Sequence, residues 1–407
     1  MKKHLIVLLA ALAAGNAHAQ ETPSRKYLSG NWNGVRDRLE EGGLLIRPRV
    51  TVFNHNFVSG EGDPKSVFNG KAQLEVKLKG RALGLSKWTL VTKAEHNFGE
   101  ALHNSGRTLI PKNTAITFPG FREGERFDIS SAYLAFAPKP GRQVLLGKIN
   151  MVDLAAGTPF SGGAGLDAFW SVGLAAPVSG ITPPYILGAV STISGKKLRW
   201  TFMAYDPVSA VRKTGLEAPF REGIVLSASP SANVNIGGLP GSHAVRVAFS
   251  TQSGKNLYNL GDINPPVPVP LTDKDFRYYA SYSFNQTLKQ VDATNGWGLF
   301  GQIAFSDGNP NPLDWSFFVG LGGSSFFPNR AQDRWGIGLY NYSLSPILAQ
   351  KAQAVGITLR DEIGLETFYQ YWPNSWFSIG GNVQVINPMI QNNKTAVFLG
   401  LRSSVKL

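Results

Sequence analysis

The stretch KAQLEVKLK, residues 71–79, alternates strictly between apolar and polar side chains. Its even-numbered residues, from Ala72 to Leu78, are alanine, leucine or valine, and its odd-numbered residues are lysine, glutamine or glutamate. Successive side chains of a β-strand point to opposite faces, so this pattern predicts a strand with one apolar and one polar face. The same alternation recurs at 198–205, 244–249, 360–371 and 376–386.

The pattern continues along the chain as strands joined alternately by short turns and long loops. Tight-turn sequences stand at 138–141, 194–197 and 372–375, and long connections cover 96–126, 150–183, 251–275 and 343–358. The expected strands are sixteen: 46–58, 69–79, 88–97, 127–137, 142–150, 184–194, 197–206, 221–230, 242–252, 275–286, 295–306, 313–322, 333–343, 358–371, 376–386 and 394–407. An even number of alternating strands with this turn layout is typical of an outer-membrane barrel.

The predicted fold class is therefore all-β, a transmembrane antiparallel β-barrel of 16 strands with a short N-terminal periplasmic helix. The alternative is a soluble all-β protein, such as a propeller or a large sandwich, but no internal repeat of propeller length is visible in the sequence. The last strand, 394–407, is expected to pair with the first, because lipid does not tolerate an open sheet edge. Leu399 and Leu401 would then face lipid, and Arg402 would face the lumen.

Two segments with different sequence patterns precede the barrel. Residues 1–19 have a basic start, an apolar run and Ala17-His18-Ala19 before Gln20, which predicts a cleaved secretory signal peptide. Residues 20–45 contain a short amphipathic helix, expected at about 33–41, and the barrel domain is predicted to cover 46–407. The chain contains no cysteine, so disulfides do not stabilise it.

The polar faces of the strands predict a lumen lined by charges of both signs. Loss of Lys2 and Lys3 with the signal peptide lowers the formal net charge from +13 to +11. The basic residues stand singly among apolar ones, which argues against a nucleic-acid partner. The expected pore-lining charges are Lys93, Arg199, Arg246, Arg360, Glu362, Glu366 and Arg402.

The long connection 150–183 is the strongest candidate for a functional loop, because long loops inside a compact architecture are usually functional or disordered. It is apolar enough to fold into the lumen and narrow it. Asp153 and Asp167 are candidates to accept hydrogen bonds from sugar hydroxyls. Phe160 and Trp170 are candidates to stack on a sugar ring, or simply to anchor the loop to the wall.

Motifs for catalysis and metal binding are missing from the sequence. No His-Glu-x-x-His spacing and no Gly-x-Ser-x-Gly elbow is present. We therefore expect no enzyme activity, no metal and no cofactor.

Several segments carry the motifs of one known family. LSGNWNGVRDRLEEGGLLI (28–46) contains a Gly-x-Trp-x-Gly-x-Arg opening, and LLGKINMVDLAAGTPFSGGAG (145–165) contains a Gly-Lys-x-Asn strand end before the long loop. Further segments are GLFGQIAFSDGNPNPLDWSFFVGLGG (298–323), RWGIGLYNYSLS (334–345) and DEIGLETFYQYWPNSWFSIGGNVQVINP (361–388). In this order they resemble the carbohydrate-selective porins of the OprB type, from Gram-negative outer membranes.

The resemblance implies a multi-pass barrel in the outer membrane whose inward-folded loops leave a narrow eyelet. Monosaccharides and small oligosaccharides, neutral and glucose-like, would diffuse passively through it. Lys148 and Asn150 would lie at the root of the constricting loop, and Arg47, Arg49 and Glu95 would be wall partners across the lumen. Lipid, lipopolysaccharide and the barrel-assembly machinery would be further partners. The sequence does not decide whether the protein is a monomer or a homo-oligomer.

Two other functions remain as alternatives. The net positive charge would also suit an anion-selective or general diffusion porin. A secreted carbohydrate-binding lectin would share the sugar-binding groups but not the membrane location.

Overall fold

The computed structural model describes residues 25–102, 104–119, 127–210, 214–260, 272–292, 295–327 and 329–407. The expected signal peptide, 1–19, and part of the long connection 96–126 lie outside these described residues.

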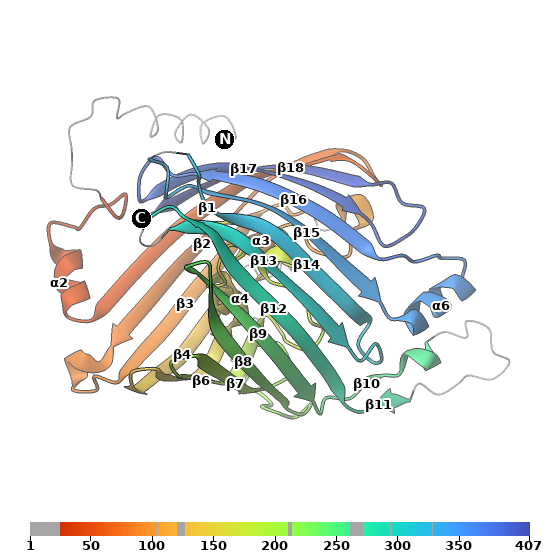
Figure 1. Cartoon of the computed structure of the whole chain (residues 1–407), viewed down its shortest axis with the longest axis horizontal. Helices are drawn as coiled ribbons and strands as arrows, with labels where there is room; N and C mark the ends of the chain where they lie inside the picture. The colour runs from red at the N-terminus through yellow and green to blue at the C-terminus, as the bar shows by residue number, and fades with distance from the viewer. Residues whose placement is uncertain are drawn as a thin grey trace.

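Sixteen antiparallel strands form one closed barrel (Figure 1), which confirms the predicted fold class. Neighbours in the sheet are neighbours in the chain, apart from the closing pair, as hairpin connections require. The strands are β1 (Leu44–Ser59), β2 (Lys65–Lys79), β3 (Trp88–Gly99), β4 (Phe127–Lys139), β5 (Arg142–Asn150), β6 (Tyr185–Ser194), β7 (Leu198–Tyr205), β8 (Val225–Ile236), β9 (Leu239–Ser250), β12 (Arg277–Gln290), β13 (Gly296–Ser306), β14 (Leu313–Ser324), β15 (Arg334–Leu344), β16 (Glu362–Tyr371), β17 (Phe377–Asn387) and β18 (Ala396–Lys406).

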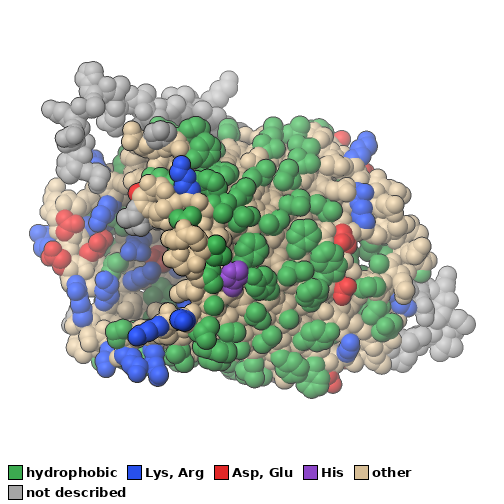
Figure 2. Space-filling model, in the orientation of Figure 1, with side chains coloured by type: hydrophobic (Ala, Val, Ile, Leu, Met, Phe, Trp, Pro, Cys, Tyr) green, Lys and Arg blue, Asp and Glu red, His purple; other side chains and the backbone are tan. Residues whose placement is uncertain are grey.

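The barrel closes where the last strand pairs with the first. β18 and β1 pair from Arg49 with Lys406 to Ser59 with Val397, so neither strand presents an open edge. Leu399 and Leu401 of β18 are exposed, whereas Arg402 is buried inside the barrel. Figure 2 shows apolar side chains spread over the outer surface of the strands, as the alternation predicts.

Most strand boundaries differ from those expected by a few residues, and two of the differences are instructive. β8 extends to Ile236 and turns through Gly237 and Gly238, both with positive φ, directly into β9. Two consecutive glycines between paired strands are a hairpin signal, because such turns need positive φ at both central residues. β16 begins at Glu362 instead of residue 358, because only Leu359 of the preceding segment forms an isolated bridge, to Ile390.

The remaining elements are short and lie in the connections. They are α2 (Val35–Glu41), α3 (Thr114–Thr117), α4 (Met151–Ala156), α5 (Val172–Ala175), α6 (Pro346–Ala354), the 3₁₀ turns η1 (Gly80–Leu83), η2 (Ser105–Arg107) and η3 (Leu257–Asn259), and a small hairpin of β10 (Gly254–Lys255) with β11 (Asp273–Lys274). None of the helices in the described residues has the length and hydropathy to cross a membrane.

The N-terminal helix lies beside the closing seam of the barrel. Arg36 of α2 lies between the rings of Tyr27 and Trp32, with its guanidinium carbon 3.9 and 4.1 Å from their centroids. The same guanidinium donates to the backbone oxygens of Gly30 at 2.9 Å and Leu407 at 3.0 Å. The Gly-x-Trp-x-Gly-x-Arg motif therefore joins the start of the chain to its last residue.

Candidate functional site

Residues 151–184, here called the inner loop, leave β5 and run inside the barrel before returning to β6 (Figure 1). Their first element, α4, begins at Asn150, whose side-chain oxygen accepts from the backbone N–H of Val152 at 2.9 Å and of Asp153 at 3.4 Å. An asparagine in this capping position fixes the start of a helix because it satisfies N–H groups that have no partner within the helix. Asn150 thus sets the direction in which the inner loop enters the lumen.

A buried ion network connects α4 to the wall. Glu95 lies 3.0 Å from the ammonium of Lys71 and 3.2 Å from that of Lys93, and Lys93 also binds Asp153 at 2.6 Å. Glu95 and both lysines are almost fully buried. Burial raises the pKa of Asp153 above its ordinary value, although Lys93 opposes this effect. The network explains how charges persist inside the protein, since a buried charge without a partner is strongly disfavoured.

A second buried pair lies beside this network. Lys148 Nζ lies 3.0 Å from a carboxylate oxygen of Asp128, and both side chains are almost fully buried. Lys148 therefore lies at the root of the inner loop and is partnered by a residue that sequence reasoning missed.

Arg49 binds the far end of the inner loop. Its guanidinium contacts both carboxylate oxygens of Asp167, at 2.8 and 2.6 Å, and the hydroxyl of Ser404 at 2.6 Å. Partial removal from water alone would raise the pKa of Asp167, but Arg49 outweighs this effect, so the pKa lies below its ordinary value. A two-point arginine–carboxylate contact fixes orientation as well as distance, so it holds this part of the loop in place.

Three further charged residues of the wall hold loop backbone, and two of them bind the inner loop. Glu366 accepts from the N–H groups of Trp170 at 2.6 Å and Ser171 at 2.8 Å. Arg402 donates to the carbonyls of Gly165 and Ala168, at 2.8 and 2.9 Å. These two side chains were expected to line open water, but both are buried beneath the loop.

The third, Glu362, binds a different segment, residues 100–119, here called the upstream loop. Its carboxylate accepts from the N–H groups of Leu109 at 2.5 Å and Ile110 at 2.8 Å. The two loops also bind each other, because the N–H of Thr114 donates to Trp170 O at 2.6 Å and that of Val172 to Pro111 O at 3.0 Å. Both loops therefore form one body inside the barrel.

Wall glycines leave room for the aromatic residues of the inner loop. Trp170 is 1% exposed and packs edge-on against Phe53, with ring centroids 5.0 Å apart. A Cβ on Gly400 would lie 2.5 Å from the Trp170 ring, and one on Gly336 would lie 2.6 Å from the ring of Phe169. Because its ring is enclosed, Trp170 serves as an anchor to the wall and has no free face for a sugar.

An open cavity of about 350 Å³ remains between the inner loop and the opposite side of the barrel. On the barrel side, this cavity is lined mainly by strands β9, β12 and β13, which we call the polar wall. These three strands contain no Asp or Glu. Its polar lining residues on these strands are Arg246, Tyr279, Ser281, Ser283, Asn285 and Gln302, and the loop contributes Thr158, Ser161, Ser179 and Thr182.

Arg246 is the one charged side chain lining this cavity among the described residues. Its Nε donates to Ser227 at 3.0 Å, and its Nη2 donates to Thr182 at 2.8 Å and Tyr205 at 3.3 Å. Its Nη1 has no hydrogen bond in the part of the chain that the structure describes, so this donor is available to a solute.

A second cavity, of about 310 Å³, lies on the other side of the same loop segment, since Thr158 lines both. It brings together Phe160 and Asp167 of the inner loop with Arg334 of β15. The Asp167 side chain is 39% exposed and remains accessible from the lumen while it binds Arg49.

Arg47, Arg199 and Arg360 line neither of the two cavities. Arg47 is exposed and 3.4 Å from Glu75, and Arg199 is an exposed residue near the turn end of β7. Arg360 precedes β16 and donates to the carbonyls of Pro388 at 2.9 Å and Asn393 at 3.2 Å, so it joins two loops instead of lining the pore.

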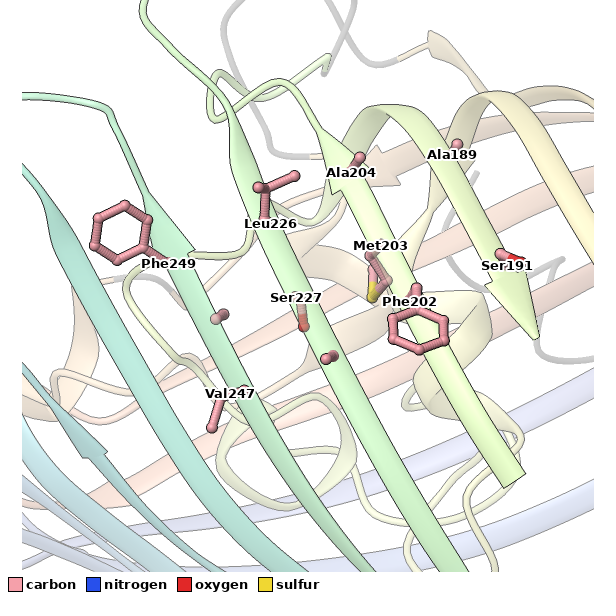
Figure 3. A pocket seen from close by; sticks show the side chains of 11 residues that line it. Ala189, Ser191, Phe202, Met203, Ala204, Leu226, Ser227, Val247 and Phe249 are labelled. Carbon is pink, nitrogen blue, oxygen red and sulfur yellow. The ribbon is translucent and has the colours of Figure 1, made fainter. Parts of the chain in front are cut away.

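A further hollow, of about 560 Å³, is a groove across β6 to β9 on the outside of the barrel (Figure 3). It runs between Phe202, Leu226 and Phe249, which are all exposed on the apolar outer surface. This groove therefore has no part in the passage.

Sequence reasoning missed most of the polar wall. The stretch YYASYSFNQT, residues 278–287, places Tyr279, Ser281, Ser283 and Asn285 on one face by simple alternation. These residues carry no charge, and a search for charged lining residues therefore passed over them. No group of His, Cys, Asp and Glu suited to a metal lies within the described ranges.

Comparison with known proteins gives one family and one fold. The model of the carbohydrate-selective porin, OprB family, matches residues 190–407. The structure is similar to the high-pH structure of Pseudomonas putida OprB, with 15% identity and a TM-score of 0.80, over 96% of this chain and 100% of that one. It is also similar to the outer membrane channel DcaP of Acinetobacter baumannii, with 12% identity and a TM-score of 0.54, over 89% and 97% of the two chains. No curated protein matches the sequence.

Proposed function

Because the chain belongs to the carbohydrate-selective porin, OprB family, we propose that it lets neutral monosaccharides and small oligosaccharides diffuse passively across the outer membrane. The route is the passage between the inner loop and the polar wall. A cavity of about 350 Å³ lies there, which is within the range of about 300–1,000 Å³ of small-molecule sites.

The observation that carries this proposal is that, apart from Arg246, the polar side chains lining the open side of the lumen are uncharged. Hydroxyl and amide side chains both donate and accept hydrogen bonds, which matches the alternating donors and acceptors of a sugar. The acids on the opposite wall are already bound by lysine or arginine, as in the networks of Glu95 and Asp128. A neutral polyol therefore crosses without meeting an unpaired carboxylate.

Within this passage we assign contacts to particular residues. Arg246 offers its free Nη1 to a sugar hydroxyl, and Tyr279 and Gln302 flank it in the same cavity. Phe160 and Asp167 offer an apolar ring and a carboxylate at the second cavity.

Liposome swelling with neutral sugars of increasing size tests the proposal. We expect glucose-sized sugars to enter quickly and the rate to fall steeply for larger oligosaccharides. Strong preference for anions in single-channel recordings, with no sugar permeation, would overturn it.

Anion selectivity is the second candidate function, and one observation favours it. Arg246 and Arg334, one at each cavity, form no ion pair in the part of the chain described by the structure, so the passage has a cationic excess. A lumen dominated by unpaired cations selects anions. Reversal potentials across a salt gradient separate this function from sugar diffusion.

A further inference from the structure

Three hairpins at the turn end of the barrel carry exposed basic residues. We call Lys87, Lys139, Arg142, Lys196 and Lys197 the basic rim; all five are exposed. None of them forms an ion pair with an acid among the residues that the structure describes. Figure 2 shows Lys and Arg side chains gathered at this end of the molecule.

The backbone of these hairpins forms one continuous edge. The N–H of Ala137 donates to Lys87 O at 2.8 Å, which joins the turn before β3 to the end of β4. The N–H of Ser194 donates to Gly141 O at 2.6 Å, which joins the β4–β5 turn to the end of β6. The three hairpins that carry the five cations are therefore joined to one another through their backbone.

The chain itself does not neutralise this concentration of charge. Lys139 and Arg142 are opposite each other in the β4–β5 ladder, and Lys196 and Lys197 are consecutive. Like charges directly opposite in a ladder are destabilising. The sequence has no Asp or Glu in 76–94, 129–152 or 168–205, which include all three hairpins. An anion bound at the rim would relieve this repulsion.

Aromatic residues next to the rim fix its depth in the membrane. Trp88 stacks on Phe136 with ring centroids 4.4 Å apart, and Trp200 stacks on Phe202 at 5.7 Å. Both tryptophans are exposed on the outer surface, and tryptophan is enriched at membrane–water interfaces. The short turns of outer-membrane barrels face the periplasm, so the basic rim lies at the level of the periplasmic headgroups.

We propose that the basic rim binds the phosphate groups of anionic phospholipids in the periplasmic leaflet. Lys and Arg at a membrane surface attract anionic lipid over about one Debye length, so only headgroups beside the hairpins are held. The rim would give the barrel an annulus of anionic lipid on the β3–β7 side only.

Native mass spectrometry of the purified porin tests this binding. The protein is released from detergent after incubation with equal amounts of phosphatidylglycerol and phosphatidylcholine that carry the same acyl chains. We expect phosphatidylglycerol to be retained in excess. Replacing all five rim residues by Gln should reduce that excess about tenfold. This reduction is smaller than the product of the single contributions, since each basic residue is expected to contribute roughly fivefold at low salt.

A matched variant removes five positive charges at the opposite end and should keep the preference for phosphatidylglycerol. Its substitutions to Gln are at Lys65, Lys255, Lys274, Lys351 and Lys394. A second rim variant, with Arg at the four lysine positions, should also keep it. The mobility of unheated samples on gels shows that each barrel is folded, and glucose swelling should be unchanged in all of them.

Two results would overturn the proposal. The first is an undiminished preference for phosphatidylglycerol in the five-site Gln variant, or an equal loss in the variant of the opposite end. The second is binding of the rim to purified peptidoglycan with no preference between the two lipids.

Discussion

The two sides of the lumen use polar residues in opposite ways. In the charged wall, strands β1 to β5, nine charges that face the lumen are bound in ion pairs; they are Arg47, Arg49, Lys71, Glu75, Lys77, Lys93, Glu95, Asp128 and Lys148. In the polar wall, Arg246 is hydrogen-bonded only to hydroxyl groups, and its neighbours are serine, tyrosine, asparagine and glutamine.

This difference shows that a charged residue on the inner face of a barrel does not necessarily contact the solutes that pass through it. Charges of the first wall hold the inner loop against it, as in the contacts of Arg49 with Asp167 and of Lys93 with Asp153. The second wall is left uncovered and faces the cavity. Changes to the charged wall should therefore alter stability and pore width, and changes to the polar wall should alter permeation alone.

Removing the centre of the buried ion network is expected to have the largest effect. Glu95→Ala leaves Lys71 and Lys93 buried without their shared carboxylate, and breaking such a network costs about 3–5 kcal/mol. Denaturant unfolding of the barrel, followed on gels of unheated samples, measures the loss. Ser281→Ala in the polar wall is the control and should change stability by less than about 0.5 kcal/mol. Equal effects of the two substitutions would remove the distinction between the walls.

Releasing the inner loop is expected to have the next largest effect. Glu366→Ala leaves the N–H groups of Trp170 and Ser171 unsatisfied, at about 1–3 kcal/mol for each buried group. The loop should leave the wall, and single-channel conductance should rise severalfold. Glu75→Ala, which removes a partly exposed carboxylate near the pore end, serves as the control and should leave conductance within twofold. A narrow channel in the Glu366 variant would show that other contacts suffice to hold the loop.

A substitution in the polar wall should change permeation without changing stability much. Arg246→Gln removes the free guanidinium donor, and one hydrogen bond of about 1 kcal/mol corresponds to roughly fivefold in a rate or affinity. We expect glucose entry to change by up to this factor and anion preference to fall. Sugar entry that is unaffected, together with unchanged reversal potentials, would exclude Arg246 from the passage.

Acid should loosen the charged wall by a smaller amount. The pKa of Asp167 lies below its ordinary value because of Arg49, so the contact stabilises the folded loop above about pH 4 and is lost as the pH falls through the lowered value. As the pH falls below about 4 and this contact is lost, conductance should rise. Asp167→Asn should start from a higher conductance and lose this pH dependence. A rise of the same size in both proteins would assign the effect to other groups.

Much of the barrel follows from period-two alternation, because a buried or lipid-exposed face requires it residue by residue. Alternation places Lys71, Glu95 and Arg402 on the inner face, where the structure has them. The end of β8 also obeys the rule, because Ala232, Val234 and Ile236 alternate with polar residues, although the expected strand stopped at residue 230.

The roles of the inner residues could not be predicted in the same way. Whether Glu366 lines water or lies beneath a loop depends on contacts with Trp170, almost two hundred positions away in the chain. Period two says which side of the sheet a residue occupies but not what covers it. The glycines that receive the loop rings, such as Gly400, carry no signal of their own until the loop is in place.

The contact of Arg36 with Leu407 makes the two ends of the chain depend on each other. The carbonyl that Arg36 binds belongs to the final residue, and the N–H of that residue donates to Pro48 O of the first strand at 3.0 Å. A chain that stops a few residues early has nothing for the N-terminal motif to hold. Loss of the last residues would therefore weaken the N-terminal segment and the seam between β1 and β18 at the same time.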